Sequence, residues 1–193
     1  MSFEQTADEQ TADERTADER TADERTADER TADERTADER TADEQAVREH
    51  NRSIVEQYMN TRGEDRLRRH LLFTEDGVGG LWTNETGNPI TITGRDRLGE
   101  HAVWSLRCFP DWAWTDVEIF STQDPNRFWV ECRGEGKIVY PGYPVGHYTN
   151  HFIHSFLFED GKIKQQREFM NPCQQFRALG IDVPQVRREG IPT

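Results

Sequence analysis

A glutamate and a histidine, Glu168 and His101, are the side chains of this sequence best suited to moving protons. Phe169 and Met170 follow Glu168, and burial among such apolar side chains would raise the pKa of its carboxyl, whereas the preceding Arg167 would lower it. A carboxyl with a raised pKa can donate a proton near neutral pH. Histidine exchanges protons in the same range. The pair would therefore suit a reaction of a small ketone that needs an acid and a base.

Ser105 lies four residues after His101, so the two side chains would share one face of a helix. Nucleophilic hydrolysis is not expected of this serine, because no Gly-x-Ser-x-Gly turn surrounds it and a serine inside a helix is poorly placed to attack a substrate. We therefore expect Ser105 to be a polar group in a binding pocket.

Three histidines, His147, His151 and His154, have the spacing of ligands on a helix, but their segment alternates like a strand. In a strand His154 would face the opposite side from the other two, and no carboxylate or cysteine stands at ligand spacing nearby. The sequence therefore predicts no metal site and leaves His154 free to line a pocket.

Arg66, Arg68 and Arg69 form a small basic cluster. A nucleic-acid site is not expected, because the sequence beyond the tail has no broad basic face. In an α-helix Arg69 would lie about 200° from Leu67, on the solvent side of a short helix that buries Leu67 and Leu71. Arg69 could then reach a pocket only if that helix ended or turned there.

The first 45 residues are nearly all repeats of Thr-Ala-Asp-Glu-Arg. A period of five matches neither a helix nor a strand, and alanine is the only apolar residue of the repeat, so we predict a disordered tail over residues 1–45. This tail holds 17 acidic and 6 basic residues and accounts for most of the net charge of −13. Residues 46–193 are nearly neutral and long enough for one folded domain.

The elements that must position these side chains follow the order helices first, strands afterwards. Helices are expected over residues 46–61, 65–70, 95–107 and 172–179, and strands over residues 90–93, 112–120, 127–139, 147–158 and 162–170. Val47 should share the buried face of the first helix, and Gly77, Gly79 and Gly80 should lie in a loop or hairpin. Short turns join the strands, so the sheet should be antiparallel. This order predicts an α+β fold of the ketosteroid-isomerase or nuclear-transport-factor type, in which a curved antiparallel sheet wraps around helices and forms a cone-shaped pocket.

Tyr148 and Glu168 lie in neighbouring predicted strands and can share a pocket only if the pairing has the right parity. A regular two-residue loop of Asp160 and Gly161 would turn Glu168 away from Tyr148. We therefore predict a three-residue loop that begins at Glu159 and has Gly161 in the left-handed conformation, or an equivalent bulge nearby.

Six segments carry a resemblance that covers essentially all of residues 50–193. Two of them are Glu100-His101-Ala102-Val103-Trp104-Ser105 and Arg167-Glu168-Phe169-Met170-Asn171-Pro172, and the others span residues 54–63, 65–77, 125–132 and 188–193. Together they resemble the phenazine biosynthesis protein A/B family. The repeats of the tail have no counterpart in this resemblance.

The resemblance implies a small homodimeric enzyme that needs neither a metal nor an organic cofactor. The implied substrate is an aminocyclohexenone carboxylate, an amino-ketone acid. Two copies would meet head to tail, and each amine would attack the ketone of the other to form the tricyclic phenazine precursor. Glu168 and His101 would be the acid/base pair, Ser105 and Tyr148 would be polar groups of the pocket, and Arg69 would be a candidate to bind the substrate carboxylate.

Imine formation makes two demands that these residues could meet. The amine must attack as a neutral group, and the carbinolamine then needs a proton donor as it loses water. Holding two reactive aminoketones in register could itself lower the barrier by roughly 7–11 kcal/mol at the upper end. The enzyme would then act mainly by orienting its substrates and supplying protons.

Two other functions stay open at this point. The same acid and base could serve an isomerase or dehydratase that acts on another small ketone, and a domain of this shape could be a non-catalytic module that binds phenazine intermediates or sister enzymes. The identity of the substrate would distinguish the isomerase or dehydratase from the condensing enzyme. A glutamine at position 168 that left the rate unchanged would indicate the second.

The sequence has no secretory leader and no apolar run long enough to cross a membrane. Its three cysteines are far apart and odd in number, so they predict no disulfide framework. We therefore expect a cytoplasmic protein with neither a membrane nor a nucleic acid as its partner.

Overall fold

The computed structural model describes residues 39–190 and residue 192, and residues from Ala46 onwards form one compact unit. The predicted disorder of the tail falls mostly on residues outside this part. For residues 39–45 the prediction is wrong, because they are the first turns of a helix that spans residues 39–60. Once a helix is nucleated, each further residue adds a backbone hydrogen bond, and the Ala, Glu, Gln and Arg residues of this stretch are good helix formers.

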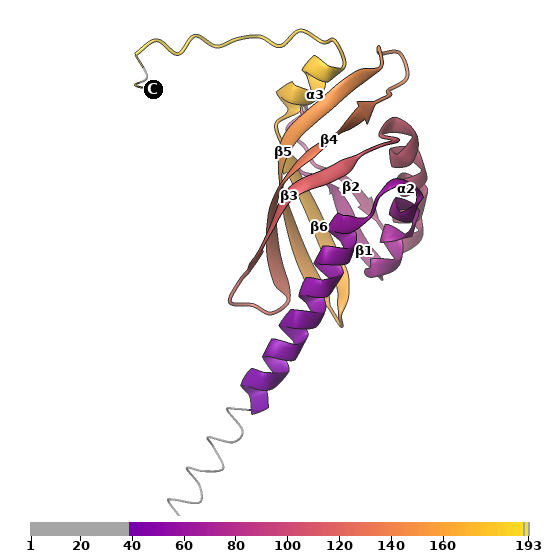
Figure 1. Ribbon diagram of the computed structural model, residues 1–193, viewed down its shortest axis with the longest axis vertical. Coiled ribbons are helices and arrows are strands. Elements are labelled where there is room, and N and C mark those ends of the chain that lie inside the picture. Colours follow the sequence, from indigo (N-terminus) through magenta and orange to yellow (C-terminus); the bar gives the residue numbers. More distant parts are fainter. Residues whose placement is uncertain (1–38, 191, 193) are drawn as a thin grey trace, which may run out of the picture. The chain divides into compact units, whose positions relative to one another are not determined.

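Figure 1 shows the elements that follow this first helix. They are the 3-10 helix η1 (Gly63–Leu72), the strands β1 (Phe73–Leu81) and β2 (Ile90–Thr93), the helix α2 (Arg95–Cys108), the strands β3 (Ala113–Ser121), β4 (Arg127–Ile138), β5 (Gly146–Glu159) and β6 (Lys162–Met170), and the helix α3 (Pro172–Ala178). The α+β class is confirmed, and so is the order of the predicted elements, to which the structure adds β1.

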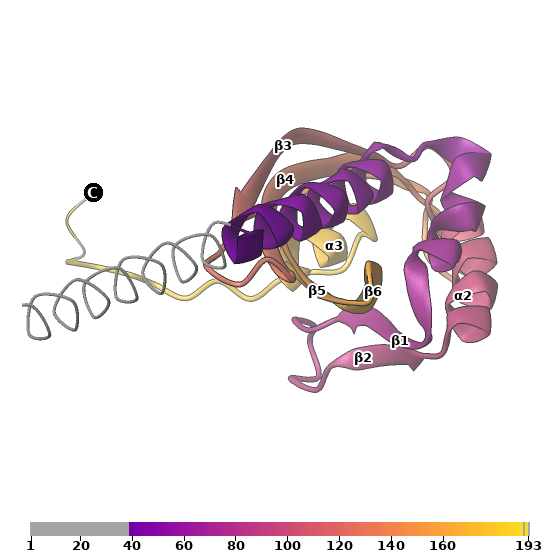
Figure 2. The same ribbon diagram turned by 90° about the horizontal axis from the view of Figure 1, so that it is seen from below.

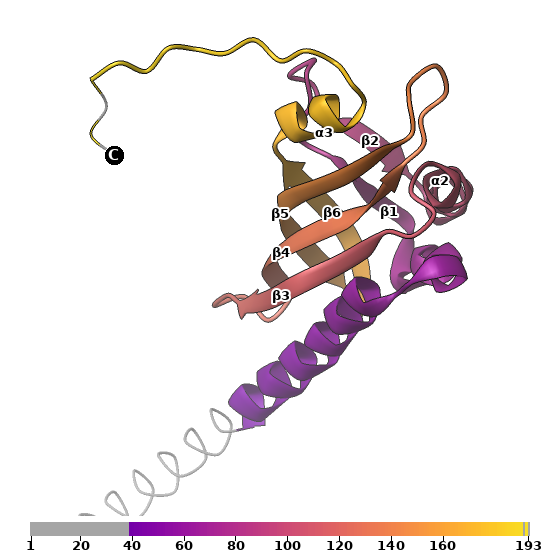
Figure 3. The ribbon, with the colours of Figure 1, turned by 45° about the horizontal axis from the view of Figure 1, so that its top comes forward.

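The six strands form one curved sheet in the order β2-β1-β6-β5-β4-β3 (Figure 3). Four of the five neighbouring pairs are antiparallel, but β1 and β6 run parallel. The prediction of a wholly antiparallel sheet is therefore wrong at this pair. The reason is that the other four strands and α2 lie between β1 and β6 in the chain, so no tight turn constrains their direction.

Strand β1 contains the three glycines that were expected in a loop or hairpin. The loop is wrong, whereas the hairpin is present, because β1 pairs antiparallel with β2, the next strand of the chain. A Cβ atom on Gly79 would lie 2.9 Å from Leu98 Cδ2, and one on Gly80 would lie 2.1 Å from the backbone oxygen of Ile90. These glycines therefore let the neighbouring α2 and β2 approach β1 closely. Glycine inside a strand often marks such a close approach.

The first helix lies on the concave side of the sheet, and α2 lies beside β1 (Figure 2). The buried face of the first helix is formed by Asn51, Val55 and Met59. Asn51 Nδ2 donates to the backbone oxygen of Pro125 at 3.1 Å and so fastens the helix to the turn between β3 and β4. The expected burial of Val47 is wrong, since its side chain is 41% exposed.

Aromatic rings fill the concave face of the sheet around Gly134 of β4. A Cβ atom at this position would lie 2.3 Å from Trp112 and within 3 Å of both Trp114 and Phe152. The missing side chain of Gly134 therefore makes room for these three rings, which form one wall of the interior.

The helix η1 has three residues per turn, so side chains three apart in the sequence lie on one face. This geometry turns Arg66, Arg69 and Leu72 towards the interior, and it leaves Leu71 52% exposed. The prediction that Leu67 and Leu71 form the buried face is therefore wrong, because it assumed the 100° rotation of an α-helix. The same change of geometry places Arg69 at the pocket.

The connection between β5 and β6 has two residues, Asp160 and Gly161, both with positive φ angles (50° and 70°), as a type I′ turn requires. The predicted three-residue loop is therefore wrong, but the predicted equivalent bulge is present. Phe158 pairs with Ile163, whereas Leu157 pairs with Gln165, so β6 has one extra residue at this point. The extra residue restores the parity that brings Glu168 opposite His154 on the concave face.

Candidate functional site

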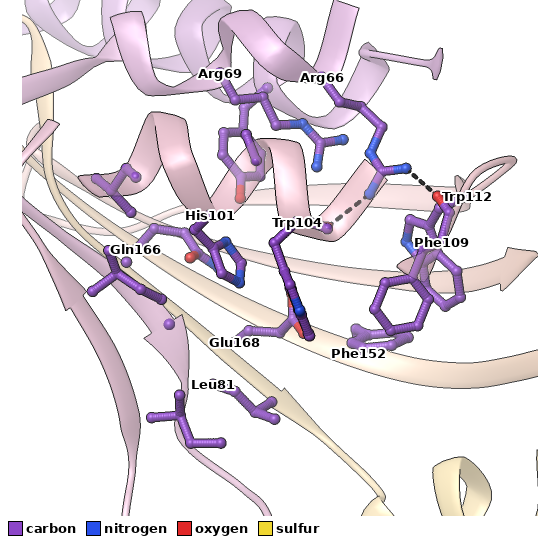
Figure 4. A pocket seen from close by; sticks show the side chains of 18 of the residues that line it. Arg66, Arg69, Leu81, His101, Trp104, Phe109, Trp112, Phe152, Gln166 and Glu168 are labelled. Carbon is purple, nitrogen blue, oxygen red and sulfur yellow. Dashed lines mark hydrogen bonds between the residues drawn. The ribbon is translucent and has the colours of Figure 1, made fainter. Parts of the chain in front are cut away.

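A cavity of about 200 Å³ opens between η1, α2 and the concave face of the sheet. Five of the six side chains predicted for the site line it: Arg69, His101, Ser105, Tyr148 and Glu168. Figure 4 shows the guanidinium groups of Arg66 and Arg69 on the η1 side of this cavity and the carboxyl of Glu168 on the β6 side. The structure therefore brings together residues that are up to a hundred positions apart in the chain.

The carboxyl of Glu168 lies at the base of the cavity and is only 27% exposed. No described residue donates a hydrogen bond to it. Burial raises the pKa of Glu168 to about 7, although the positive charge of Arg69 acts in the opposite direction. Burial therefore outweighs the neighbouring arginine, and this carboxyl can hold and release a proton near neutral pH.

The raised pKa of Glu168 predicts a specific cost in stability. A glutamate in the unfolded chain has a pKa of about 4.3. The folded protein therefore binds the proton of the Glu168 carboxyl more tightly than the unfolded chain does. The contribution of this proton to the free energy of unfolding is complete below the unfolded pKa and is lost as the pH rises through about 7. Because Glu168→Gln cannot ionise, it should be more stable than the wild type at pH 8 by up to about 3 kcal/mol, and equally stable at pH 4.

Urea denaturation at pH 4, 6 and 8 measures this difference. Glu64→Gln is the matched control, because Glu64 is an exposed residue of η1 and should show no such trend. A stability difference between Glu168→Gln and the wild type that does not change with pH would contradict the prediction.

Helix α2 contributes His101 and Trp104 to the cavity, and their rings lie side by side with centroids 5.4 Å apart. The imidazole of His101 keeps contact with solvent at the cavity. Partial desolvation there, followed by the positive charge of Arg66, lowers the pKa of His101. The imidazole is therefore neutral at neutral pH and can accept a proton, while the nearby carboxyl of Glu168 can donate one.

Arg66 is buried and joins η1 to α2. One of its terminal nitrogens donates to Ser105 Oγ at 2.9 Å, and the other donates to the backbone oxygen of Phe109. Burial lowers the pKa of Arg66 to about 10, so the group still carries its charge at neutral pH. The hydroxyl oxygen of Ser105 is therefore the acceptor of this hydrogen bond, and Arg66 holds that hydroxyl at the wall of the cavity.

Arg69 extends over the ring of Tyr58, with 4.7 Å between its Cζ atom and the ring centroid, and its Nε donates to Thr61 Oγ1. Burial lowers its pKa as well. Among the described residues, no carboxylate oxygen lies within salt-bridge distance of either Arg66 or Arg69. Two charged guanidinium groups without a carboxylate partner among the described residues give this wall a positive charge that can attract an anion, and a guanidinium suits a planar carboxylate.

Aromatic rings form another part of the wall. The rings of Trp112 and Tyr148 lie 5.2 Å apart, and Phe109 and Phe152 pack around them. The hydroxyl of Tyr148 accepts a hydrogen bond from Asn150 Nδ2 at 2.9 Å, and burial raises its pKa. Tyr148 is therefore a protonated phenol that can donate one hydrogen bond into a slot suited to flat rings.

The structure places His154 behind this cavity rather than on its wall. Its side chain is fully buried, and its Nδ1 lies 3.9 Å from Glu168 Oε2. His147 and His151 face the other side of the sheet, as the alternation of a strand predicts. In the part of the chain that the structure describes, no group of three or more His, Cys, Asp or Glu residues is placed to hold a metal ion.

Many polar or aromatic residues of the cavity were not among the predicted site residues, and they include Arg66, Trp104 and Gln166. The spacing of Arg66, Arg69 and Leu72 at intervals of three was a usable signal, because it matches a 3-10 helix. Trp104 and Gln166 gave no such signal, since their positions depend on how α2 packs and where β6 has its bulge. Among the described helices, none is long and apolar enough to cross a lipid bilayer.

Comparison with known proteins identifies the family. The family model for phenazine biosynthesis protein A/B matches residues 33–193. The chain belongs to this family. One similar relative is the phenazine biosynthesis protein PhzB1 of Pseudomonas aeruginosa, which is 69% identical over 147 residues, covering 76% of this chain and 91% of the relative.

Solved structures agree with this assignment. The crystal structure of a phenazine biosynthesis-related protein (PhzB2) from Pseudomonas aeruginosa is similar, with 64% identity and a TM-score of 0.78, and the match covers 79% of this chain and 99% of that one. A protein from Catenulispora acidiphila with a ketosteroid isomerase-like fold has a TM-score of 0.55 at 15% identity, covering 67% and 93% of the two chains. The latter shows the fold alone. Membership of the A/B family supports a role for this chain in phenazine biosynthesis.

Proposed function

We propose that this protein catalyses the condensation of two aminocyclohexenone carboxylate molecules into the tricyclic phenazine precursor by forming C=N bonds. The observation that carries the proposal is the composition of the cavity. It combines a carboxyl that can be protonated near neutral pH, a neutral imidazole and two guanidinium groups without a counter-ion. A substrate that has a ketone, an amine and a carboxylate has a complementary group for each of these.

Each C=N bond would form in two steps. The amine nitrogen attacks the ketone carbon, and a proton moves from nitrogen to the former ketone oxygen to give a carbinolamine. Glu168 then donates a proton to the hydroxyl as the C–O bond breaks and water leaves, and His101 accepts the remaining proton from nitrogen. Two such rounds release two molecules of water and consume no oxidant, reductant or cofactor. General acid and base groups typically contribute about 10²–10⁴-fold to such steps.

Orientation would be the second contribution of the protein. The arginines on the η1 side would hold a substrate carboxylate, and the aromatic slot around Trp112 and Tyr148 would hold a planar ring. Fixing two reacting molecules in this way replaces an encounter in solution by a reaction within one complex. The protein could therefore accelerate a reaction that also proceeds without it.

We further propose that the protein is a homodimer, as the resemblance to the family implies. Phe120 of β3 and Ile153 of β5 point to the convex side of the sheet, and their side chains are 45% and 41% exposed. Burial of these residues against a second copy would remove an apolar surface from water. Light scattering coupled to size-exclusion chromatography measures the mass and should give twice that of one chain.

A variant that fills the cavity tests whether the reaction takes place there. Ala102 lines the cavity on α2, whereas the adjacent Val103 is exposed and does not. Ala102→Trp should occupy much of the space and reduce tricycle formation towards the uncatalysed rate, at least about 10-fold, because the transition state no longer fits. Val103→Trp adds the same side chain at the next position and should keep the wild-type rate.

The measurement is the rate of tricycle formation from freshly generated substrate, with each protein and without protein. A wild-type protein that does not exceed the uncatalysed rate would refute the condensing function. Ligand binding or a reaction of another small ketone would then be the functions to pursue. If wild type is active and Ala102→Trp is equally active, the reaction takes place outside this cavity.

A further inference from the structure

A buried polar layer lies beside Glu168 and is not used by the mechanism above, although one of its two members also lines the cavity. It consists of His154 of β5, which is fully buried, and Gln166 of β6, which is 4% exposed. His154 is the cross-strand partner of Glu168, and Gln166 lies two residues before it on the same face of β6. Buried polar groups are costly to maintain unless they are paired, so this layer needs a physical explanation.

The contact between these two residues assigns the tautomer of the imidazole when the amide nitrogen is the donor. Gln166 Nε2 lies 3.0 Å from His154 Nδ1, so in this amide orientation Nδ1 is the acceptor and the ring proton is on Nε2, a buried atom with no hydrogen-bond partner among the described residues. Burial, followed by the charge of Arg69, lowers the pKa of His154 to about 3. The imidazole is therefore neutral, and its approach of 3.9 Å to Glu168 Oε2 is not an ion pair.

The Nδ1 atom thus has one lone pair and two possible donors. One is the amide of Gln166, and the other is the hydroxyl of Glu168 when that carboxyl is protonated. His154 cannot turn to offer another atom, because the ring of Trp114 meets it edge to face with centroids 4.8 Å apart, and the ring of Phe152 stacks beside it.

We propose that His154 and Gln166 are positioning residues for Glu168: the neutral imidazole accepts the proton of the acidic form, and Gln166 competes for the same acceptor. A hydrogen bond to the protonated form of a carboxyl stabilises that form. The pair would therefore determine both the orientation of the acid and the pH range in which it keeps its proton. This inference rests on the proposed role of Glu168 as the acid of the condensation.

The proposal predicts opposite effects of two substitutions. In His154→Leu the acceptor is lost and the freed amide of Gln166 can donate to the carboxylate, so the pKa of Glu168 should fall by about one unit. In Gln166→Leu the acceptor is left to Glu168 alone, so its pKa should rise by about half a unit to one unit. His154→Asn keeps an acceptor oxygen close to the position of Nδ1 and should stay near the wild-type value.

Other titratable groups also act on Glu168 and must stay unchanged in the comparison. They are Tyr58 of the first helix, Arg69 of η1, His101 of α2, Cys132 of β4, Tyr140 in the following loop and Tyr148 of β5. None of them is altered in the three variants. A general loosening of the core would expose Glu168 to water and lower its pKa in every variant, so only shifts of opposite sign support the proposal.

The experiment is an NMR titration of protein labelled with ¹³C at the glutamate carboxyls, in which the signal missing from Glu168→Gln assigns Glu168. Shifts of opposite sign in His154→Leu and Gln166→Leu would support the proposal. Shifts of the same sign, or no shift in either variant, would overturn it. If His154→Leu does not fold, an upward shift in Gln166→Leu together with an unchanged His154→Asn decides in favour, and any other result decides against.

The titration needs no substrate, so its outcome is independent of the condensing activity. Opposite shifts in a protein that does not accelerate condensation would refute the proposed function and leave the positioning of Glu168 intact. Conversely, an active enzyme whose rate depends on Glu168 but whose titration is unaffected by both substitutions would refute only the positioning role. In an active enzyme, the pH at which the rate falls should move with the titration of each variant.

Discussion

Tricycle formation by Glu168→Gln should be slower than by the wild type by about 10²–10⁴-fold, the usual range for loss of a general acid. Glutamine keeps the size and the hydrogen-bonding shape of the side chain but has no proton to donate to the leaving hydroxyl. The substitution also removes a buried ionisable group, so the variant should be at least as stable as the wild type at neutral pH. A large loss of rate in a stable protein would therefore report on the chemistry rather than on the fold.

The pH dependence of the rate is the second part of this result. Because burial raises the pKa of Glu168 to about 7, the acidic form is lost as the pH rises through that value. The wild-type rate above background should therefore fall about tenfold per pH unit once the pH is well above 7. The residual rate of Glu168→Gln should show no such fall. Initial rates between pH 6 and pH 9, corrected for the uncatalysed reaction at each pH, measure both profiles.

Two outcomes would contradict a role for Glu168 as the acid. Equal rates of Glu168→Gln and wild type, both above background, would mean that the protein acts by orienting its substrates alone. A wild-type rate that stays constant between pH 7 and pH 9 would mean that the proton comes from another group. Glu64→Gln, at an exposed position of η1, serves again as the control and should keep both the rate and its pH profile.

The helices and strands that hold Glu168 could be predicted from sequence because their patterns are local. Strand β6 occupies Lys162–Met170, as the alternation of its residues predicts, and α2 extends only one residue beyond the predicted range. The face of the sheet on which Glu168 lies could be predicted only on the condition that it shares a pocket with Tyr148. The requirement that Glu168 share a face with Tyr148 implied an irregularity, but its position in β6 depends on packing with β5 that no local pattern records.

The errors share one physical cause, which is that tertiary contacts decided the local geometry. Gly79 and Gly80 suggested a turn, yet they lie in a strand because α2 and β2 approach β1 too closely for side chains. The rotation of an α-helix alone put Arg69 on the solvent side, and only the family resemblance made it a site residue, whereas η1 is a 3-10 helix that turns it inwards. His154 was left free to line a pocket, and parity alone could not show that its side chain would be fully buried beside Glu168 instead of lining the cavity.

The arginines of η1 lead to the second large effect. Arg69→Met should raise the KM for the carboxylate substrate by at least about 30-fold, since removing one partner of a buried charge pair typically costs 2–5 kcal/mol. Methionine can keep the packing over Tyr58, which Arg69 covers at 4.7 Å. Arg69 is a better choice than Arg66 for this test, because Arg66 also joins η1 to α2 through Ser105 and Phe109. Arg68→Met, on the exposed side of the same helix, is the matched control and should leave KM unchanged.

A second readout separates loss of binding from damage to the cavity. The charge of Arg69 lowers the pKa of Glu168, so its removal should let the acid keep its proton to a higher pH. In Arg69→Met the fall in rate above pH 7 should therefore begin at a higher pH than in the wild type, although more substrate is needed to saturate the enzyme. A distorted cavity would admit water and move this fall in the opposite direction, because hydration of Glu168 lowers its pKa. A higher KM combined with an upward shift of the pH profile would show that Arg69 binds the substrate carboxylate and moderates the acid at the same time, whereas an unchanged KM would assign that carboxylate to another group.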